Sequence, residues 1–194
     1  MKKNWMRFVV LALVVLLLPL QAMAQATETP EASALPTNDA GMPHMPTFFQ
    51  GSTLDLTPYA GKAIFINFFT GWCQYCMEEM PFIKTIYDDY SPDEVQIILV
   101  HVWQGETAAD SAKVVNEFSL QALTMVEDED VSLASLVGIP GYPTSLFIGK
   151  DGYLHKALAQ GLTYDDMSGF LDEMGVAKRD AAEVAASLKK ETGI

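Results

Sequence analysis

The chain has 194 residues, of which 25 are acidic and 12 basic, and its formal net charge is −13. Such an acidic chain is not expected to bind nucleic acid or an anionic membrane surface. It contains two cysteines and three histidines, none of the histidines paired at ligand spacing, so it offers a poor set of zinc ligands and we expect no metal site.

The first 24 residues have the pattern of a cleaved secretory signal peptide. Three basic residues precede an apolar stretch over 8–20, and Ala22-Met23-Ala24 has the small-x-small form of a cleavage site. The apolar stretch is shorter than the roughly 20 residues of a membrane span. We therefore expect an extracytoplasmic protein, periplasmic or secreted, with an uncleaved signal acting as a membrane tether as the alternative. Removing residues 1–24 changes the formal charge from −13 to −16.

Residues 25–46 are rich in Ala, Thr, Pro and Glu and hold few large apolar side chains, which is the composition of a flexible linker. We expect one folded domain over 47–175, because its length suits a single core. The remaining residues, 176–194, are expected to form an appended C-terminal helix.

Two runs, 63–69 and 95–102, are apolar at nearly every position and predict central strands covered on both faces. Between them, residues 78–90 carry apolar side chains at helical spacing, interrupted early by Pro81. The default connection between two such strands through a helix is a right-handed parallel crossover.

The rest of the chain predicts further helices and a hairpin. The expected elements are a helix at 108–118, a strand at 122–126, a helical turn at 131–137 ended by Gly138, strands at 144–148 and 153–160, and helices at 164–174 and 177–190. The two late strands are joined by a turn with an Asp-Gly pair, which is typical of a hairpin. Together these elements predict an α/β fold with a mixed central sheet and helices on both faces.

The only two cysteines, Cys73 and Cys76, lie where the strand 63–69 should turn into a helix. At this spacing they can close a small disulfide ring, while one stays exposed to attack a substrate. Cys73 would lie against the N–H groups of the helix N-terminus, which stabilise a thiolate. We expect a redox centre in which Cys73 attacks and Cys76 resolves. A purely structural disulfide is the alternative, although so small a ring removes little unfolded-state entropy.

Residues 61–81 contain the string GK…NF…WCxxCxxExP, and Tyr142-Pro143-Thr144 precedes the first strand of the predicted hairpin. With these motifs the chain resembles thioredoxin-fold proteins over roughly 47–175, and within them the exported branch of TlpA and ResA type. The resemblance implies a thioredoxin-like fold and an exported thiol-disulfide oxidoreductase that uses its dithiol and no cofactor.

The resemblance also implies roles for single residues. Pro143 corresponds to a cis-proline that faces the dithiol, Tyr142 would pair through its backbone with a substrate strand, and Trp72 belongs to the same substrate-binding surface. Glu79 matches a glutamate thought to serve the resolving thiol, with an ordinary exposed helix acid as the alternative. Asn67 stands where cytoplasmic thioredoxins carry a buried aspartate, so proton transfer is expected to come from elsewhere.

The implied function is the reduction of disulfides in client proteins, with electrons supplied by a membrane electron-donor protein. Candidate clients by resemblance are apocytochrome c during cytochrome c biogenesis or an exported methionine sulfoxide reductase. Gln74 and Tyr75 separate the cysteines where this branch often has a proline, which leaves the redox potential open. A disulfide-forming oxidase and a non-enzymatic thioredoxin-fold binding module are therefore alternatives. A peroxiredoxin is disfavoured, because Pro58 and Thr70 do not complete its Pro-x-x-x-Thr-x-x-Cys string.

Overall fold

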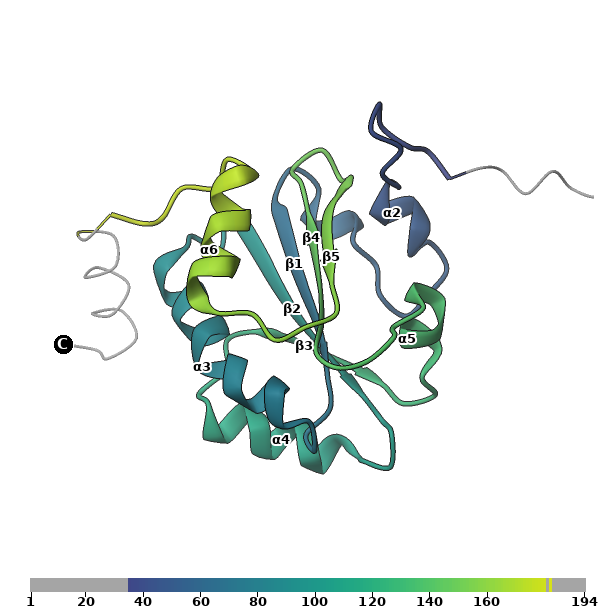
Figure 1. Ribbon diagram of the computed structural model, residues 1–194, viewed down its shortest axis with the longest axis vertical. Helices are drawn as coiled ribbons and strands as arrows, with labels where there is room; N and C mark the ends of the chain where they lie inside the picture. The colour runs from purple at the N-terminus through teal and green to yellow at the C-terminus, as the bar shows by residue number, and fades with distance from the viewer. Residues whose placement is uncertain (1–34, 181, 183–194) are drawn as a thin grey trace, which may run out of the picture. The chain divides into compact units, whose positions relative to one another are not determined.

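The computed structural model describes residues 35–180 and residue 182 (Figure 1). The predicted signal peptide, residues 25–34 of the predicted linker and most of the predicted last helix lie outside the described residues. No helix in the described part is both long enough and apolar enough to cross a lipid bilayer.

The described elements are, in chain order, α2 (Met45–Phe48), the short 3₁₀ helix η1 (Thr57–Tyr59), β1 (Ala63–Phe69), α3 (Gln74–Asp89), β2 (Val95–Val102), α4 (Ala108–Glu117), β3 (Thr124–Asp128), α5 (Ser132–Val137), β4 (Thr144–Ile148), β5 (Leu154–Leu158) and α6 (Tyr164–Glu173).

The five strands form one mixed sheet in the order β3-β2-β1-β4-β5. Strand β2 runs parallel to β1 and to β3, whereas β4 is antiparallel to β1 and to β5. Every residue of β1 is buried, which fits its central place and its continuous apolar run. The predicted α/β class with a mixed sheet and a C-terminal hairpin is confirmed.

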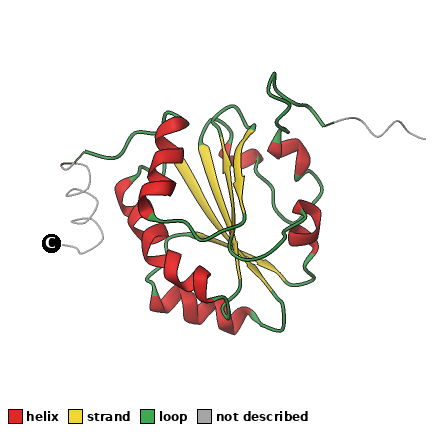
Figure 2. Ribbon diagram, viewed as in Figure 1, coloured by secondary structure: helices red, strands yellow, loops and turns green. Residues whose placement is uncertain are grey.

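Helices cover both faces of the sheet, as Figure 2 shows. One face packs against α3, α4 and α6, and the sheet contributes Phe65, Phe69 and Phe147 to that core. The other face packs against α2 and α5 through the alternate side chains of β1, among them Ile66 and Phe68. The amino end of α3 follows the carboxyl end of β1 after a short turn, so the dithiol lies near the carboxyl end of the central strand.

The folded part begins earlier than the expected boundary near Thr47. Met45 is buried in the second core, and the backbone of Leu154 donates a 3.0 Å hydrogen bond to the carbonyl of Pro43. His44 forms an isolated bridge with Tyr153. A polar, proline-rich stretch with one buried methionine gives no periodic signal, so the composition alone placed these residues in the linker.

The predicted helix over 177–190 does not begin at Ala177. Val176 is buried against the first core, Lys178 forms an isolated bridge with Tyr90, and the backbone of Arg179 donates to the carbonyl of Asp89 at 2.7 Å. Residues 177–180 are therefore not helical and are held against the end of α3, so the prediction of a helix that begins at Ala177 was wrong.

Candidate active site at the amino end of helix α3

Cys73 and Cys76 form a disulfide with their Cα atoms 5.2 Å apart. Cys73 is the N-cap of α3, and its Sγ accepts a hydrogen bond of 3.2 Å from the backbone N–H of Cys76. Cys73 is 6% exposed and Cys76 is fully buried. The first sulfur thus lies at the positive end of the helix with a small opening to solvent, narrower than the sequence suggested, and the second lies behind it.

Glu79 lies in α3 three residues after Cys76 and is only 1% exposed. Its Oε1 accepts a hydrogen bond of 2.6 Å from Asn67 Nδ2 on β1, and its Oε2 accepts one of 3.0 Å from the backbone N–H of Leu162. The interpretation of Glu79 as an exposed helix acid is therefore wrong. Glu78 is exposed and bonds only to Gln74 within the same helix turn.

Burial raises the pKa of Glu79 to about 7, and the hydrogen bonds from Leu162 and Asn67 hold it from rising further. A carboxyl group with this pKa can both take and give a proton near neutral pH. A pocket of about 280 Å³ lies beside it, lined by Tyr75, Phe82 and residues 161–163 among others. A group that can act as a general acid or base therefore lies one helix turn from Cys76.

An aromatic surface lies on the other side of the dithiol. Trp72 is 59% exposed, and its ring meets the Tyr142 ring edge-on at a centroid distance of 6.1 Å. The Tyr142-Pro143 peptide bond is cis, as the sequence predicted. Gln104 joins both aromatic residues, because its carbonyl accepts from Trp72 Nε1 at 3.3 Å and its Nε2 donates to the Tyr142 hydroxyl at 2.9 Å. We call Trp72, Gln104 and Tyr142 the aromatic surface.

The sequence analysis did not single out Gln104, His101 or Glu106, which the fold brings next to the predicted site. His101 is, with Gln96, one of two polar residues in the apolar run of β2, and that interruption was the one available signal. Among the described residues, no three or more His, Cys, Asp or Glu side chains are arranged to hold a metal ion.

The AhpC/TSA family profile matches residues 40–157. The chain is 30% identical over 125 residues to thiol-disulfide oxidoreductase ResA of Geobacillus thermodenitrificans, which covers 64% of this chain and 70% of the relative. It is 28% identical over 123 residues to ResA of Oceanobacillus iheyensis, covering 63% of this chain and 62% of that relative. The predicted resemblance and the predicted enzyme class, a thiol-disulfide oxidoreductase, are confirmed.

Solved structures agree on the fold. StoA from Bacillus subtilis is 22% identical, covers 58% of this chain and 84% of its own, and superposes with a TM-score of 0.51. A secreted disulfide oxidoreductase of Mycobacterium tuberculosis, described as homologous to Escherichia coli DsbE, is 20% identical, covers 63% and 90%, and gives a TM-score of 0.55. The predicted thioredoxin-like fold is therefore confirmed.

Proposed function

Because this chain belongs to the AhpC/TSA family, we propose that it is an exported enzyme that reduces disulfides in client proteins. The observation that carries the proposal is the asymmetry of the dithiol. Cys73 caps α3 and reaches solvent, whereas Cys76 is fully buried. A client can therefore reach only the first sulfur, which is the arrangement needed for attack by one thiol and resolution by the other.

The reaction transfers two electrons from the reduced dithiol to the client. The Cys73 thiolate attacks one sulfur of the client disulfide, forms a mixed disulfide and releases the first client thiolate. Cys76 then attacks Cys73 Sγ, which releases the second client thiolate and closes the Cys73–Cys76 disulfide seen in the structure. The N–H groups at the amino end of α3 stabilise the Cys73 thiolate before the first step.

Glu79 supplies the proton acceptor for the second step. A buried thiol is a weak nucleophile until it loses its proton, and the Glu79 carboxylate lies one helix turn from Cys76 with a pKa of about 7. When an electron donor reduces the disulfide again, the same carboxyl group can return the proton. The donor must be a dithiol protein, membrane-bound in this proposal, because an oxidising compartment does not reduce the dithiol by itself.

The client approaches along the aromatic surface and past Pro143. Its extended backbone pairs with that of Tyr142 beside the mixed disulfide, and Trp72 covers the neighbouring side chain. Export rests on the pattern of residues 1–24, which would place the enzyme in the periplasm or outside the cell. The clients proposed are apocytochrome c in cytochrome c biogenesis and an exported methionine sulfoxide reductase.

Two variants and one equilibrium measurement test this function. Cys76→Ser should accumulate mixed disulfides with extracytoplasmic proteins, because nothing resolves them, while Cys73→Ser should trap none. The reduction potential of the dithiol, measured against glutathione, should lie nearer the reductant thioredoxin, about −270 mV, than the oxidant DsbA, about −120 mV. A potential near the DsbA value would instead assign the formation of disulfides to this protein. If Cys73→Ser accumulated mixed disulfides on Cys76 and Cys76→Ser accumulated none on Cys73, the two cysteine roles would be reversed.

A further inference from the structure

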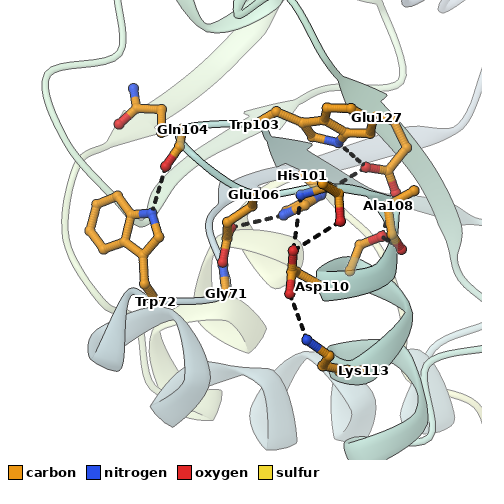
Figure 3. Close-up of polar contacts among 12 residues, drawn as sticks. Gly71, Trp72, His101, Trp103, Gln104, Glu106, Ala108, Asp110, Lys113 and Glu127 are labelled. Carbon is orange, nitrogen blue, oxygen red and sulfur yellow. Dashed lines mark hydrogen bonds and ion pairs between the residues drawn. The ribbon is translucent and has the colours of Figure 1, made fainter.

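His101 is a fully buried residue of β2 that the proposed chemistry does not use. Its Nδ1 lies 2.7 Å from Glu127 Oε2, and its Nε2 lies 3.0 Å from Glu106 Oε2 (Figure 3). An ionised carboxylate can only accept hydrogen bonds, so each contact would be a hydrogen bond donated by the ring if both nitrogens carry protons. The geometry fits an imidazolium held between two carboxylates.

Further hydrogen-bond donors hold the Glu127 side chain in place and favour its ionised form. Its Oε2 also accepts from Trp103 Nε1 at 2.6 Å, and its Oε1 accepts from the Ser111 hydroxyl at 2.5 Å. Partial burial raises the pKa of Glu127, but the hydrogen bonds from Ser111, Trp103 and His101 outweigh it and leave the pKa below its usual value. One end of the imidazolium is therefore anchored on β3 and α4.

Glu106 carries the other end of the imidazolium to the active-site turn. Its Oε2 also accepts a hydrogen bond of 2.7 Å from the backbone N–H of Gly71, two residues before Cys73. A Cβ atom built on Gly71 would lie 2.7 Å from Glu106 Oε1. The carboxylate thus occupies the space that any other residue at position 71 would need for its side chain, and Figure 3 shows it between His101 and Gly71.

The loop that ends at Glu106 also carries Gln104, which holds both Trp72 and Tyr142. The segment 103–106 is therefore fixed at its two ends, by Trp103 on Glu127 and by Glu106 on His101 and Gly71. Between these anchors the carbonyl and side-chain amide of Gln104 bind Trp72 and Tyr142. Loss of either anchor would release Gln104 from these contacts.

We propose that His101 is a positioning residue for client binding: as an imidazolium it holds Glu106 on Gly71 and thereby fixes segment 103–106, with Gln104, in the aromatic surface. The inference rests on the proposed function, since it concerns how a client disulfide is bound before Cys73 attacks. His101 touches neither sulfur nor client, and acts only through Glu106. A histidine that served only to fill the core would need no contact with the active-site turn.

Three variants test the anchor from different sides. Glu106→Gln removes the ionised acceptor, Gly71→Ala displaces the Glu106 carboxylate without touching His101, and His101→Gln keeps only one donating nitrogen. The matched control is Glu117→Gln, which removes the same charge from an exposed position of α4. Gly71 does not have a left-handed backbone, so alanine there meets the carboxylate and no backbone strain.

The readout compares two disulfides with pre-reduced protein in single-turnover reactions. One is a synthetic peptide joined to glutathione, which is long enough to contact the aromatic surface, and the other is bis(hydroxyethyl) disulfide, which is not. For the peptide, each variant should raise the half-saturating concentration about tenfold, the usual effect of losing one hydrogen bond to a charged group, with its maximal rate kept. For the compact disulfide, the rate should stay at the wild-type value. Glu117→Gln should match wild type with both.

Nitrogen-15 NMR of the full chain tests the network without any substrate. His101 should show two protonated ring nitrogens at neutral pH, and Glu106→Gln and Gly71→Ala should shift the Trp72 indole N–H signal. A neutral His101 ring, or an unchanged Trp72 signal, would overturn the inference. Wild-type peptide affinity in all three variants would overturn it while leaving the proposed function in place. A wild-type protein that reduces neither disulfide would contradict the proposed function, and the NMR result would still decide the network.

Discussion

The side-chain amide of Asn67 donates a hydrogen bond of 2.6 Å to the carboxylate of Glu79. Asn67 stands where related cytoplasmic proteins are expected to carry a buried aspartate, so the neutral residue at that place holds the acid that comes from α3. Its Nδ2 also donates to Ser145 on β4 at 3.0 Å, and its Oδ1 has no partner among the described residues. In this chain the buried acid comes from α3, and Asn67 on β1 orients it.

Glu79→Gln should slow the resolution of a mixed disulfide on Cys73 by about 10²-fold near neutral pH, the lower end of the effect of a general base. In wild type the rate should rise as pH increases through about 7, because the carboxylate fraction of Glu79 grows there. In the variant this rise should disappear. Rapid-mixing measurement of peptide release from the pre-formed mixed disulfide, at several pH values, checks this expectation.

Glu78→Gln is the matched control, since it removes an acid from the adjacent, exposed position of α3. It should keep the wild-type rate and its rise with pH. Identical pH profiles for wild type and Glu79→Gln would remove Glu79 from the mechanism.

The raised pKa of Glu79 also predicts how folding stability depends on pH. The native state keeps the Glu79 proton up to about pH 7, whereas the unfolded chain releases it near the ordinary glutamate pKa of 4.5. The free energy of unfolding therefore falls as pH rises between these two values. The loss should be about 3 kcal/mol. Glu79→Gln should abolish this part of the pH dependence, because its amide does not titrate.

Denaturant unfolding of oxidised wild type and Glu79→Gln at pH 5 and pH 8 measures the difference. The variant should gain stability relative to wild type at pH 8, and the unpaired Asn67 Oδ1 offers its new amide an acceptor after a side-chain flip. If the free energy of unfolding changes by the same amount between pH 5 and pH 8 in wild type and in Glu79→Gln, the pKa of Glu79 is not raised.

Asn67→Asp should move the pH-dependent rise of resolution to higher pH. The new carboxylate would lie within hydrogen-bond distance of Glu79 Oε1, and two such groups cannot both ionise freely, so the second ionisation occurs at a raised pKa. We expect the midpoint to rise by about one pH unit or more. Ser145→Ala is the control, because it removes the other partner of Asn67 without adding charge. A midpoint that falls in Asn67→Asp would mean that the pair is further apart in solution.

The sequence predicted the central strands well and the edges less well. The bounds of β1, β2 and β4 are those expected, because these strands are buried on both faces and read as continuous apolar runs. The edge strand β3 begins and ends two residues later than expected, and β5 begins one residue later and ends two residues earlier, since their half-exposed residues weaken the pattern. Helix α3 begins four residues earlier than its apolar spacing suggests, because a cysteine rather than a usual capping residue starts it.

The residues of the candidate site also differ in how well the sequence predicted them. Both cysteines and Glu79 lie within seven residues of each other, so a local motif was enough to find them. The partners that give Glu79 its pKa come from β1 and from Leu162, 83 positions away, and burial of that acid follows only from the tertiary packing. The bond between Glu106 and Gly71 spans 35 positions and joins residues that no periodicity relates. The sequence therefore predicted the candidate reacting groups, and the fold was needed to find the residues that contact them.

Trp72→Ala should weaken client binding with little effect on folding. Trp72 is 59% exposed, so its removal takes little area from the core, but its ring belongs to the aromatic surface and contacts Tyr142. Loss of an exposed aromatic contact of this kind should raise the half-saturating concentration of a peptide disulfide about tenfold, as truncation of an aromatic anchor in an interface often costs more than 1 kcal/mol. Leu136→Ala is the control, since Leu136 is an exposed apolar residue of α5, on the opposite face of the sheet. Titration of the Cys76→Ser protein with the peptide, together with denaturant unfolding, separates the two effects. Equal peptide affinity for wild type and Trp72→Ala would show that clients bind elsewhere around Cys73, and an unfolding loss as large as that of a core truncation would show that the ring supports the fold.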